Sequence, residues 1–309
     1  MGVVRLLVIA LIASTVVVVA FSASADLLEW KKLKFETVGQ ELPVAQSMEE
    51  LRSLFADPLV CSGCHPRQYE AWSKSFHAGS IRNAGFQALY LKYLEYLKLE
   101  ETKKTLGRAA TAEDLRQCLF CHAPLVQFAS DGLVLKISDA IAAGNWDEIR
   151  GVQIGCVMCH AVNPQGKWVT GSFKGSGTLY GPVSDPVSQA MHKSRYSPLH
   201  TRSEFCGICH SLKTFNVFCS LVYEQQKESG AEGRVSCQDC HMKGKSNVPV
   251  AIAGKKKRTL HDHTFPGGRF NAMWGEAVDM GLLVERRKSG DVLVTVNLAS
   301  KITHNIPDG

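Results

Sequence analysis

Five short segments of this chain share one arrangement of two cysteines and a histidine. In each, a Cys-x-x-Cys pair is followed at once by His: Cys61, Cys64 and His65; Cys118, Cys121 and His122; Cys156, Cys159 and His160; Cys206, Cys209 and His210; Cys237, Cys240 and His241. Two thiols at this spacing add to the vinyl groups of a haem, while the adjacent imidazole ligates its iron. The sequence therefore predicts five covalently attached c-type haems.

Other sites also use Cys-x-x-Cys pairs, namely zinc knuckles, redox dithiols and structural disulfides. None of them requires a His at the next position. Only 11 of the 309 residues are His. Five adjacent placements out of five would arise by chance on the order of once in ten million, if positions are independent. Haem attachment is therefore favoured over each alternative.

The remaining histidines are candidates for the second axial position of the irons. They are His77, His192, His200, His261, His263 and His304. A helical connection of 12 residues from His65 to His77 would span about 18 Å, so we expect His77 to reach a neighbouring haem. His304 is also expected to be a ligand.

Two choices among these histidines follow from their local sequence. Side chains alternate along an extended segment, so His261 and His263 point apart, and we assign His263 to an iron and His261 to a supporting contact. His192 and His200 both precede the fourth motif. Both stay ligand candidates, with hydrogen bonding to a haem propionate as the alternative for either.

The first 25 residues have the pattern of an export signal. Arg5 precedes an apolar run over residues 6–21, and Ala23-Ser24-Ala25 forms an A-x-A cleavage pattern. We expect cleavage after Ala25 and a periplasmic or extracellular protein, because c-type haem is attached outside the cytoplasmic membrane. An uncleaved run would instead associate the protein with the membrane.

The chain is moderately basic, with a formal charge of +6 and a pI near 8.7. A basic polypeptide invites a nucleic-acid interpretation. Each haem, however, brings two propionate carboxylates, and five haems would balance the basic excess. We therefore expect no nucleic-acid partner.

Chain length limits the kind of core that this protein builds. Five haems in 309 residues leave too little polypeptide for a separate hydrophobic core around each. We expect a mainly α fold with extensive loops wrapped around a multihaem core. The uneven spacing of the motifs excludes a repeat architecture and favours a single pentahaem domain over residues 26–275.

Local patterns predict several elements. We expect helices over residues 66–76 and 86–106, a helix capped by Thr111 that leads into Cys118, and a helix capped by Ser138 that ends at Gly144. Residues 172–198 are rich in Gly, Ser and Pro and are expected to be loop.

The character of the sequence changes after Gly275. Residues 282–286 and 292–298 flank a turn at residues 288–291 and are expected to form a hairpin. A two-stranded hairpin is marginal alone. We therefore expect residues 276–309 to begin a small, truncated β domain that continues beyond Gly309 in the native gene product.

Several segments resemble a known family. Residues 61–78 read CSGCHPRQYEAWSKSFHA and are similar to the first motif of multihaem cytochromes related to the c-554 electron carrier of hydroxylamine oxidation. The resemblance extends to residues 237–242, 263–268 and 304–309. It implies a multihaem c-type cytochrome. The c-554 carrier has four haems and this chain has five motifs, so the haem order is not carried over.

Two functions are compatible with these features. With enough histidines to close the irons, an exported carrier would pass electrons along mostly bis-His haems between redox partner proteins. The alternative is a reductase of a small nitrogen or sulfur oxyanion with one open haem. Reductases in the family often replace the attachment His by Lys, whereas all five motifs here keep His, so the sequence favours the carrier. A homo-oligomer or haem filament is compatible with it.

Two further features carry weaker implications. Cys219 is the one cysteine outside the five motifs, and its apolar neighbours favour burial over bridging or ligation. Residues 255–258 read KKKR. Such a run is ordinarily a solvated loop, and as an alternative it would steer an acidic redox partner.

Overall fold

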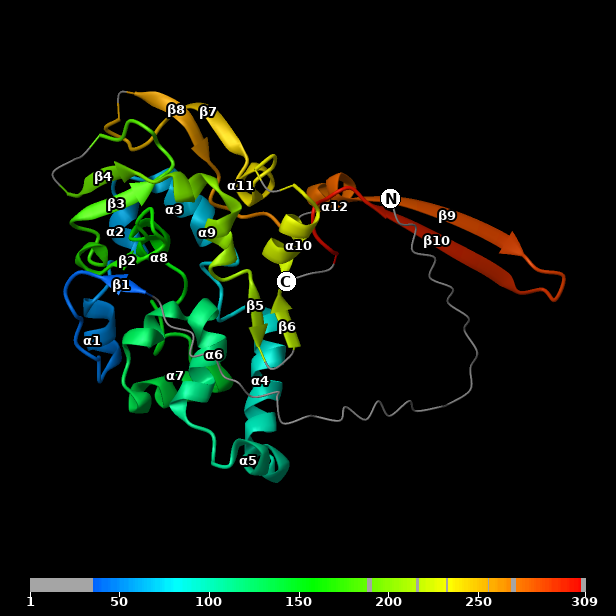
Figure 1. The fold of residues 1–309 in the computed structure, drawn as a ribbon, viewed down its shortest axis with the longest axis horizontal. Helices are drawn as coiled ribbons and strands as arrows, with labels where there is room; N and C mark the ends of the chain where they lie inside the picture. Colours follow the sequence, from blue (N-terminus) through cyan, green and yellow to red (C-terminus); the bar gives the residue numbers. More distant parts are fainter. Residues whose placement is uncertain are drawn as a thin grey trace.

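The computed structural model describes residues 36–187, 191–214, 217–231, 233–254, 256–267 and 271–306. Within these ranges the chain is mainly helical, and its strands pair only as two-stranded sheets (Figure 1). No helix in this part of the chain has the length and apolar character needed to cross a bilayer.

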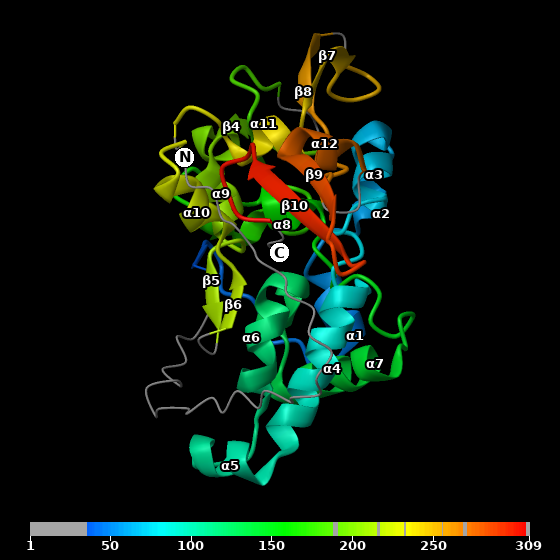
Figure 2. The same cartoon turned by 90° about the vertical axis from the view of Figure 1, so that its right-hand side faces the viewer.

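The N-terminal half carries the longer helices, which stand together in both views (Figures 1 and 2). Its helices are α1 (Met48–Ser53), α2 (Pro58–Ser62), α3 (Pro66–Ser73), α4 (Ala84–Lys98), α5 (Glu100–Leu106), α6 (Ala112–His122), η2 (Pro124–Phe128) and α7 (Asp131–Ala143).

Most expected helices in this half are present, with two corrections. The helix expected over residues 86–106 is two helices, because Leu99 adopts an extended conformation between α4 and α5. The helix expected to start at Ser138 begins at Asp131, where the Ser130 hydroxyl accepts a hydrogen bond from an N–H of the first turn. Ser138 is instead buried inside α7 and bonds the Tyr90 hydroxyl at 2.8 Å.

Local sequence explains where three of these helices begin or end. Thr111 and Asp114 form a capping box at the start of α6, which satisfies N–H groups that lack helical partners. Gly107 and Gly144 end α5 and α7 with φ of +67° and +72°, a conformation that favours glycine. These signals are local, and the sequence predicted Thr111 as a cap and Gly144 as a helix end.

Packed side chains fill this half of the molecule. Tyr90 of α4, Leu119 of α6 and Ile137 of α7 are each at most 1% exposed and belong to one apolar cluster. Beyond Leu199, only Ala231 and Val248 are buried apolar residues among the described side chains. The C-terminal half therefore has little core made of polypeptide alone.

Short helices and small sheets make up the rest. The helices are α8 (Cys156–His160), η3 (Thr170–Ser172), η4 (Pro198–Thr201), α9 (Ser203–Gly207), α10 (Val222–Glu228), α11 (Cys237–His241) and α12 (Asn271–Ala277). The sheets pair β1 (Thr37–Val38) with β2 (Trp168–Val169), β3 (Thr178–Gly181) with β4 (Lys193–Tyr196), β5 (Leu212–Thr214) with β6 (Val217–Ser220), and β7 (Gly244–Pro249) with β8 (Lys257–His261). The expectation of loop throughout residues 172–198 was thus wrong for β3 and β4, which pair in parallel.

The expected C-terminal hairpin is confirmed and is longer than expected. Strands β9 (Val278–Arg286) and β10 (Val292–Ser300) pair in antiparallel register and extend away from the other elements (Figure 1). Val284 lies opposite Val294, and Leu282 opposite Val296. These four side chains share one face of the hairpin and are between 46% and 62% exposed.

Candidate haem sites

Each attachment motif lies on a single helical turn. Motifs three and five coincide with α8 and α11, motif two ends α6, and motifs one and four begin in α2 and α9. The His65 N–H donates to the Cys61 carbonyl at 2.8 Å, and the His210 N–H donates to Cys206 at 2.9 Å. Residues three and four apart on a helix lie on one face. This turn therefore presents both thiols and the imidazole of a motif to the same side.

Backbone carbonyls orient four of the attachment imidazoles. The Nδ1 atoms of His65, His122, His160 and His241 lie 2.9, 3.2, 2.7 and 2.7 Å from the carbonyl oxygens of Val250, Ser80, Tyr180 and Pro266 respectively. A carbonyl acceptor requires the proton on Nδ1, which leaves the Nε2 lone pair for a metal. These rings are thus in the tautomer that haem ligation requires.

Four attachment histidines have a second histidine at a distance that fits one shared iron. The ring centres are 6.3 Å apart for His65 and His192, 6.4 Å for His77 and His210, 6.2 Å for His160 and His263, and 6.2 Å for His241 and His304. Two imidazoles that bind one metal through bonds of about 2 Å place their ring centres roughly 6 Å apart. The residues present therefore fit a bis-His haem at each pair.

Three of the partner rings are also oriented by carbonyl oxygens. Nδ1 of His192 lies 3.3 Å from the oxygen of Lys193, Nδ1 of His263 lies 3.0 Å from that of His261, and Nδ1 of His304 lies 2.9 Å from that of Asn305. Nε2 is again left for a metal. Burial lowers the pKa of His77 to about 3 and that of His263 to about 4. Both rings are therefore neutral at pH 7, as ligation requires.

The second attachment site differs from the other four. All eleven histidines lie in the described part of the chain, yet none pairs with His122 in this way. The ring that stacks on His122 is instead Phe86, with centres 4.2 Å apart. His122 thus has an oriented Nε2 and no second imidazole within the described residues.

His200 has a different arrangement from the paired histidines. Its ring centre is 5.8 Å from that of His160, but its Nε2 lies 3.1 Å from the Cys159 carbonyl oxygen. That carbonyl belongs to the attachment helix, so His200 lies beside α8. Its Nε2 is thus occupied by this hydrogen bond, while its buried Nδ1 has no hydrogen-bond partner among the described residues. The geometry therefore favours His263 over His200 as the partner of His160.

His261 lies close to the fifth motif. Its Nδ1 is 2.8 Å from the Met242 carbonyl oxygen, and its own carbonyl oxygen accepts from His263. His261 is thus hydrogen-bonded through its ring to Met242, which follows the fifth motif, and through its carbonyl oxygen to the ring of His263.

Cysteines of different motifs contact one another. The Cys61 thiol is hydrogen-bonded to Cys156, and Cys206 to Cys237, which lowers the pKa of Cys61 to about 7 and that of Cys237 to about 6. Cys121 contacts Cys209 in the same way. These are the thiols that would form thioether bonds to attached haems. The first motif therefore adjoins the third, the fourth adjoins the fifth, and the second adjoins the fourth.

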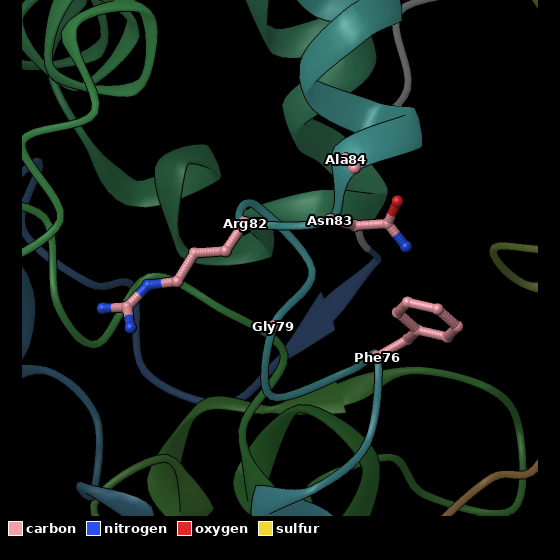
Figure 3. Close-up of a pocket in the computed structure, with 5 residues that line it drawn as sticks. All are labelled: Phe76, Gly79, Arg82, Asn83 and Ala84. Carbon is pink, nitrogen blue, oxygen red and sulfur yellow. The ribbon is translucent and has the colours of Figure 1, made fainter. Parts of the chain in front are cut away.

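A cavity of about 460 Å³ lies in the loop between His77 and α4 and is lined by Phe76, Gly79, Arg82, Asn83 and Ala84 (Figure 3). Arg82 extends away from Phe76 and Asn83 in this view. Ser80 of the same loop donates its hydroxyl to the His122 carbonyl oxygen at 2.6 Å. The cavity thus adjoins the second motif.

Comparison with known proteins shows what kind of protein carries these motifs. The family described as cytochrome c554 and c-prime matches residues 60–161, which span the first three motifs. This chain is a multihaem c-type cytochrome. Haem c is accordingly its cofactor.

Two further likenesses extend over more of this cytochrome. It is 25% identical over 214 residues to the dissimilatory sulfite reductase MccA of Wolinella succinogenes, a match that covers 62% of this chain and 30% of the relative. The cytochrome thus spans less than a third of that relative. Its fold is similar to that of a penta-haem cytochrome c552 from Thermochromatium tepidum, with a TM-score of 0.51 and 18% identity over 83% of this chain and 68% of the other.

Some expectations fall outside the described residues. They include the export signal, the Cys219 side chain and Lys255.

The sequence did not reveal the carbonyl groups that orient the imidazoles, because a backbone carbonyl carries no residue signature. The sequence also gave no motif that would identify Ser80, whose hydroxyl and carbonyl oxygen both contact His122.

Proposed function

We propose that this chain is an exported pentahaem cytochrome that carries electrons along five covalently bound haems, four of them ligated by two histidines. The observation that carries the proposal is the set of four histidine pairs with ring centres 6.2 to 6.4 Å apart. A haem with two imidazole ligands has no open position for substrate, and it supplies reversible one-electron transfer.

The contacts between motifs support an order for these haems. The first and third sites adjoin through Cys61 and Cys156, and the fourth and fifth through Cys206 and Cys237. Electrostatic coupling of Cys159 with Cys209 relates the third site to the fourth. We infer a row of sites in the order one, three, four, five, with site two beside site four.

The two ends of this row lie at the surface. Cys64 and Cys240 are the exposed cysteines among the ten motif cysteines, and the other eight are partly buried. They belong to the first and fifth motifs. We infer that electrons enter at one of these sites and leave at the other.

Protein side chains hold the geometry of this row. His77 follows the first motif but pairs with His210 of the fourth, and His263 follows the fifth motif but pairs with His160 of the third. Such crossed pairs link separate attachment sites. The polypeptide thereby sets the spacing and the axial ligands of its cofactors.

The test is to count haems and their spin states in the matured protein. We expect an intact mass that corresponds to five haems and an oxidised electron paramagnetic resonance spectrum dominated by low-spin iron. Fewer haems on a fully matured sample would show that one motif is unused. Predominantly high-spin iron would contradict the carrier.

A second candidate function is favoured by one observation. His122 has no second imidazole within the described residues, so an iron held there would keep one axial position for a small ligand. The relative MccA is a dissimilatory sulfite reductase. We propose reduction of a small sulfur or nitrogen oxyanion at this site as the alternative function, to be tested by adding sulfite and nitrite to the reduced protein and measuring their consumption.

Export and assembly complete the proposal. We propose that residues 1–25 direct the chain to the periplasm or the cell exterior and are then removed, and that redox partner proteins supply and remove its electrons. Mass determination of the N-terminus in the mature protein tests the cleavage. Light scattering of the mature protein tests for a homo-oligomer or filament.

A further inference from the structure

The ring of His77 is held by an aromatic contact in place of a hydrogen bond. Carbonyl oxygens orient the other three partner rings, whereas no hydrogen bond joins the His77 ring to any residue that the structure describes. Its ring packs against that of Phe265, with centres 4.4 Å apart and planes at 87°. We propose that Phe265 is a positioning residue that fixes the rotation of His77 and so sets the ligand orientation at the fourth site. The inference rests on the proposed electron-transfer function, in which His77 and His210 ligate one haem.

Ring orientation separates this pair from the others. The rings of His77 and His210 cross at 76°, while the three pairs whose partner ring is oriented by a carbonyl oxygen lie within 31° of parallel. An axial imidazole can turn about its bond to a metal, and a hydrogen bond at Nδ1 ordinarily stops that rotation. In a T-shaped contact, the positive edge of one ring meets the negative face of the other. Because rotation of His77 would break this contact, Phe265 has the role that a carbonyl oxygen has at the other pairs.

The backbone of Phe265 has a conformation that is unusual for its residue type. Its φ is +46°, and Asn247 is the only other described residue besides glycine with a positive φ. Asparagine adopts this region several-fold more often than most residues, whereas a bulky side chain there is an outlier. A strained conformation of this kind persists only where the surrounding structure enforces it, and such positions concentrate at functional sites. The strain is a second, independent sign that the fold places the Phe265 ring for a specific contact.

Contacts on both sides of Phe265 fix the segment that carries it. Asp262 accepts hydrogen bonds from the N–H and the hydroxyl of Thr264, both at 3.0 Å. On the other side, the carbonyl oxygen of Pro266 lies 2.7 Å from Nδ1 of His241, which ties the segment to the fifth attachment motif. The segment is therefore held before and after Phe265, and its ring offers a fixed surface to the neighbouring imidazole.

Haem binding leaves the contact between Phe265 and His77 in place. A haem ligated by His77 and His210 needs the space between those two rings, whose centres are 6.4 Å apart. The rings of Phe265 and His77 are instead in direct contact, which leaves no space for a porphyrin between them. Phe265 also lies 5.9 Å from the ring of His263, with planes at 75°. The same side chain therefore meets a partner imidazole of the third site and one of the fourth.

The angle between two axial imidazoles affects the electronic state of the iron that they bind. Nearly perpendicular imidazoles bring two d orbitals of ferric iron close in energy, which makes its low-spin signal strongly anisotropic. Nearly parallel imidazoles separate these orbitals and give a rhombic signal. By fixing the rotation of His77, Phe265 gives the fourth haem electronic properties that differ from those of the other bis-His sites in the row.

The experiment is electron paramagnetic resonance of the oxidised holoprotein with three substitutions of Phe265. Phe265→Leu keeps an apolar side chain without the flat ring, and Phe265→Gly accepts a positive φ without strain, so the backbone of the segment is retained. We expect both variants to lose the strongly anisotropic signal and to gain a rhombic low-spin signal of equal intensity, because His77 stays bound and turns. Phe265→Tyr keeps the ring and should keep the wild-type signal.

A matched control separates ring orientation from loose packing. Phe205 packs on His200 at the same distance of 4.4 Å and precedes Cys206 of the fourth motif, so Phe205→Leu removes a comparable aromatic ring close to the same haem. We expect it to leave the strongly anisotropic signal unchanged.

The possible results distinguish this proposal from the function on which it rests. The positioning role is wrong, while the histidine pairs stand, if Phe265→Gly keeps the wild-type signal or if Phe205→Leu alters it as much as Phe265→Leu does. A new high-spin signal in Phe265→Gly would also overturn it, because the ring would then hold His77 on the iron instead of fixing its rotation. A wild type without any strongly anisotropic low-spin signal would overturn the perpendicular pairing of His77 with His210 itself.

Discussion

The imidazole rings of His77 and His210 lie 6.4 Å apart with their planes at 76° to each other. The three other histidine pairs at this separation have planes within 31° of parallel. This pair joins the segment after the first motif to the fourth motif. It therefore differs from the others in the mutual orientation of its rings.

Ring orientation leads to a spectroscopic prediction. Nearly perpendicular imidazoles leave two d orbitals of ferric iron close in energy, which makes its g values strongly anisotropic. We expect one strongly anisotropic low-spin signal from this pair and rhombic low-spin signals from the other three. Electron paramagnetic resonance of the oxidised protein measures both.

A pair of variants assigns that signal. His77→Ala should abolish the strongly anisotropic signal and produce a high-spin one, because the iron loses an axial imidazole. The control His261→Ala should leave it unchanged. If the anisotropic signal survives in His77→Ala, the pairing of His77 with His210 is wrong.

The second attachment site should behave differently from the rest. We expect one of the five irons to be high spin in the wild type, since His122 has no second imidazole among the described residues. Cyanide should bind at that one iron and convert it to low spin. A wild type with five low-spin irons would show that another side chain completes this site and would exclude the reductase alternative.

Replacement of His200 should leave the iron ligands intact. His200 is 7% exposed and lies between the third and fifth motifs, since its Nε2 bonds Cys159 and its carbonyl oxygen accepts from Gln238. His200→Ala should lower the free energy of unfolding by about 1–3 kcal/mol, because buried polar groups lose their partners. It should add no high-spin signal, whereas His263→Ala should add one. A new high-spin signal in His200→Ala would identify it as a ligand.

The buried carboxylate at the start of α6 should stabilise the fold. Asp114 is 1% exposed and accepts from the Thr111 N–H at 2.6 Å and from Arg108 at 2.6 and 2.9 Å. Asp114→Ala should cost about 2–3 kcal/mol, because Arg108 and the helix start lose their partner. Chemical unfolding of the holoprotein measures this, and Glu113→Ala, on the same turn but only partly buried, is the control.

The same carboxylate should contribute to acid sensitivity. Burial opposes ionisation of Asp114, but its hydrogen bonds with Arg108 and Thr111 outweigh burial and hold its pKa below 3.8. A depressed folded-state pKa stabilises the protein above the unfolded pKa, and that contribution is lost as pH falls through the folded value. The wild type should therefore lose its advantage over Asp114→Asn below about pH 4. An unchanged difference at pH 3 would contradict this.

Sequence alone identified the parts of this protein that depend on short-range geometry. Five Cys-x-x-Cys-His segments each fit one helical turn, so the residues predicted to attach haem are recognised without knowledge of the fold. Gly107, Gly144, Thr111 and the alternation of residues 292–298 also act locally. The corresponding helix ends and the hairpin were predicted for this reason. The prediction of a helix start at Ser138 was wrong, because a buried serine inside a helix cannot be told from a helix cap by its sequence.

Only the tertiary structure decided how the histidines pair and which sites are neighbours. His77 pairs with His210, and His200 turns its Nε2 to Cys159 instead of to an iron position. These outcomes depend on how distant segments pack, which no local pattern specifies. For the same reason the sequence could not predict which carbonyl groups orient the imidazoles, because any residue has a backbone oxygen. Only the fold places those of Val250, Ser80, Tyr180 and Pro266 beside the imidazole rings.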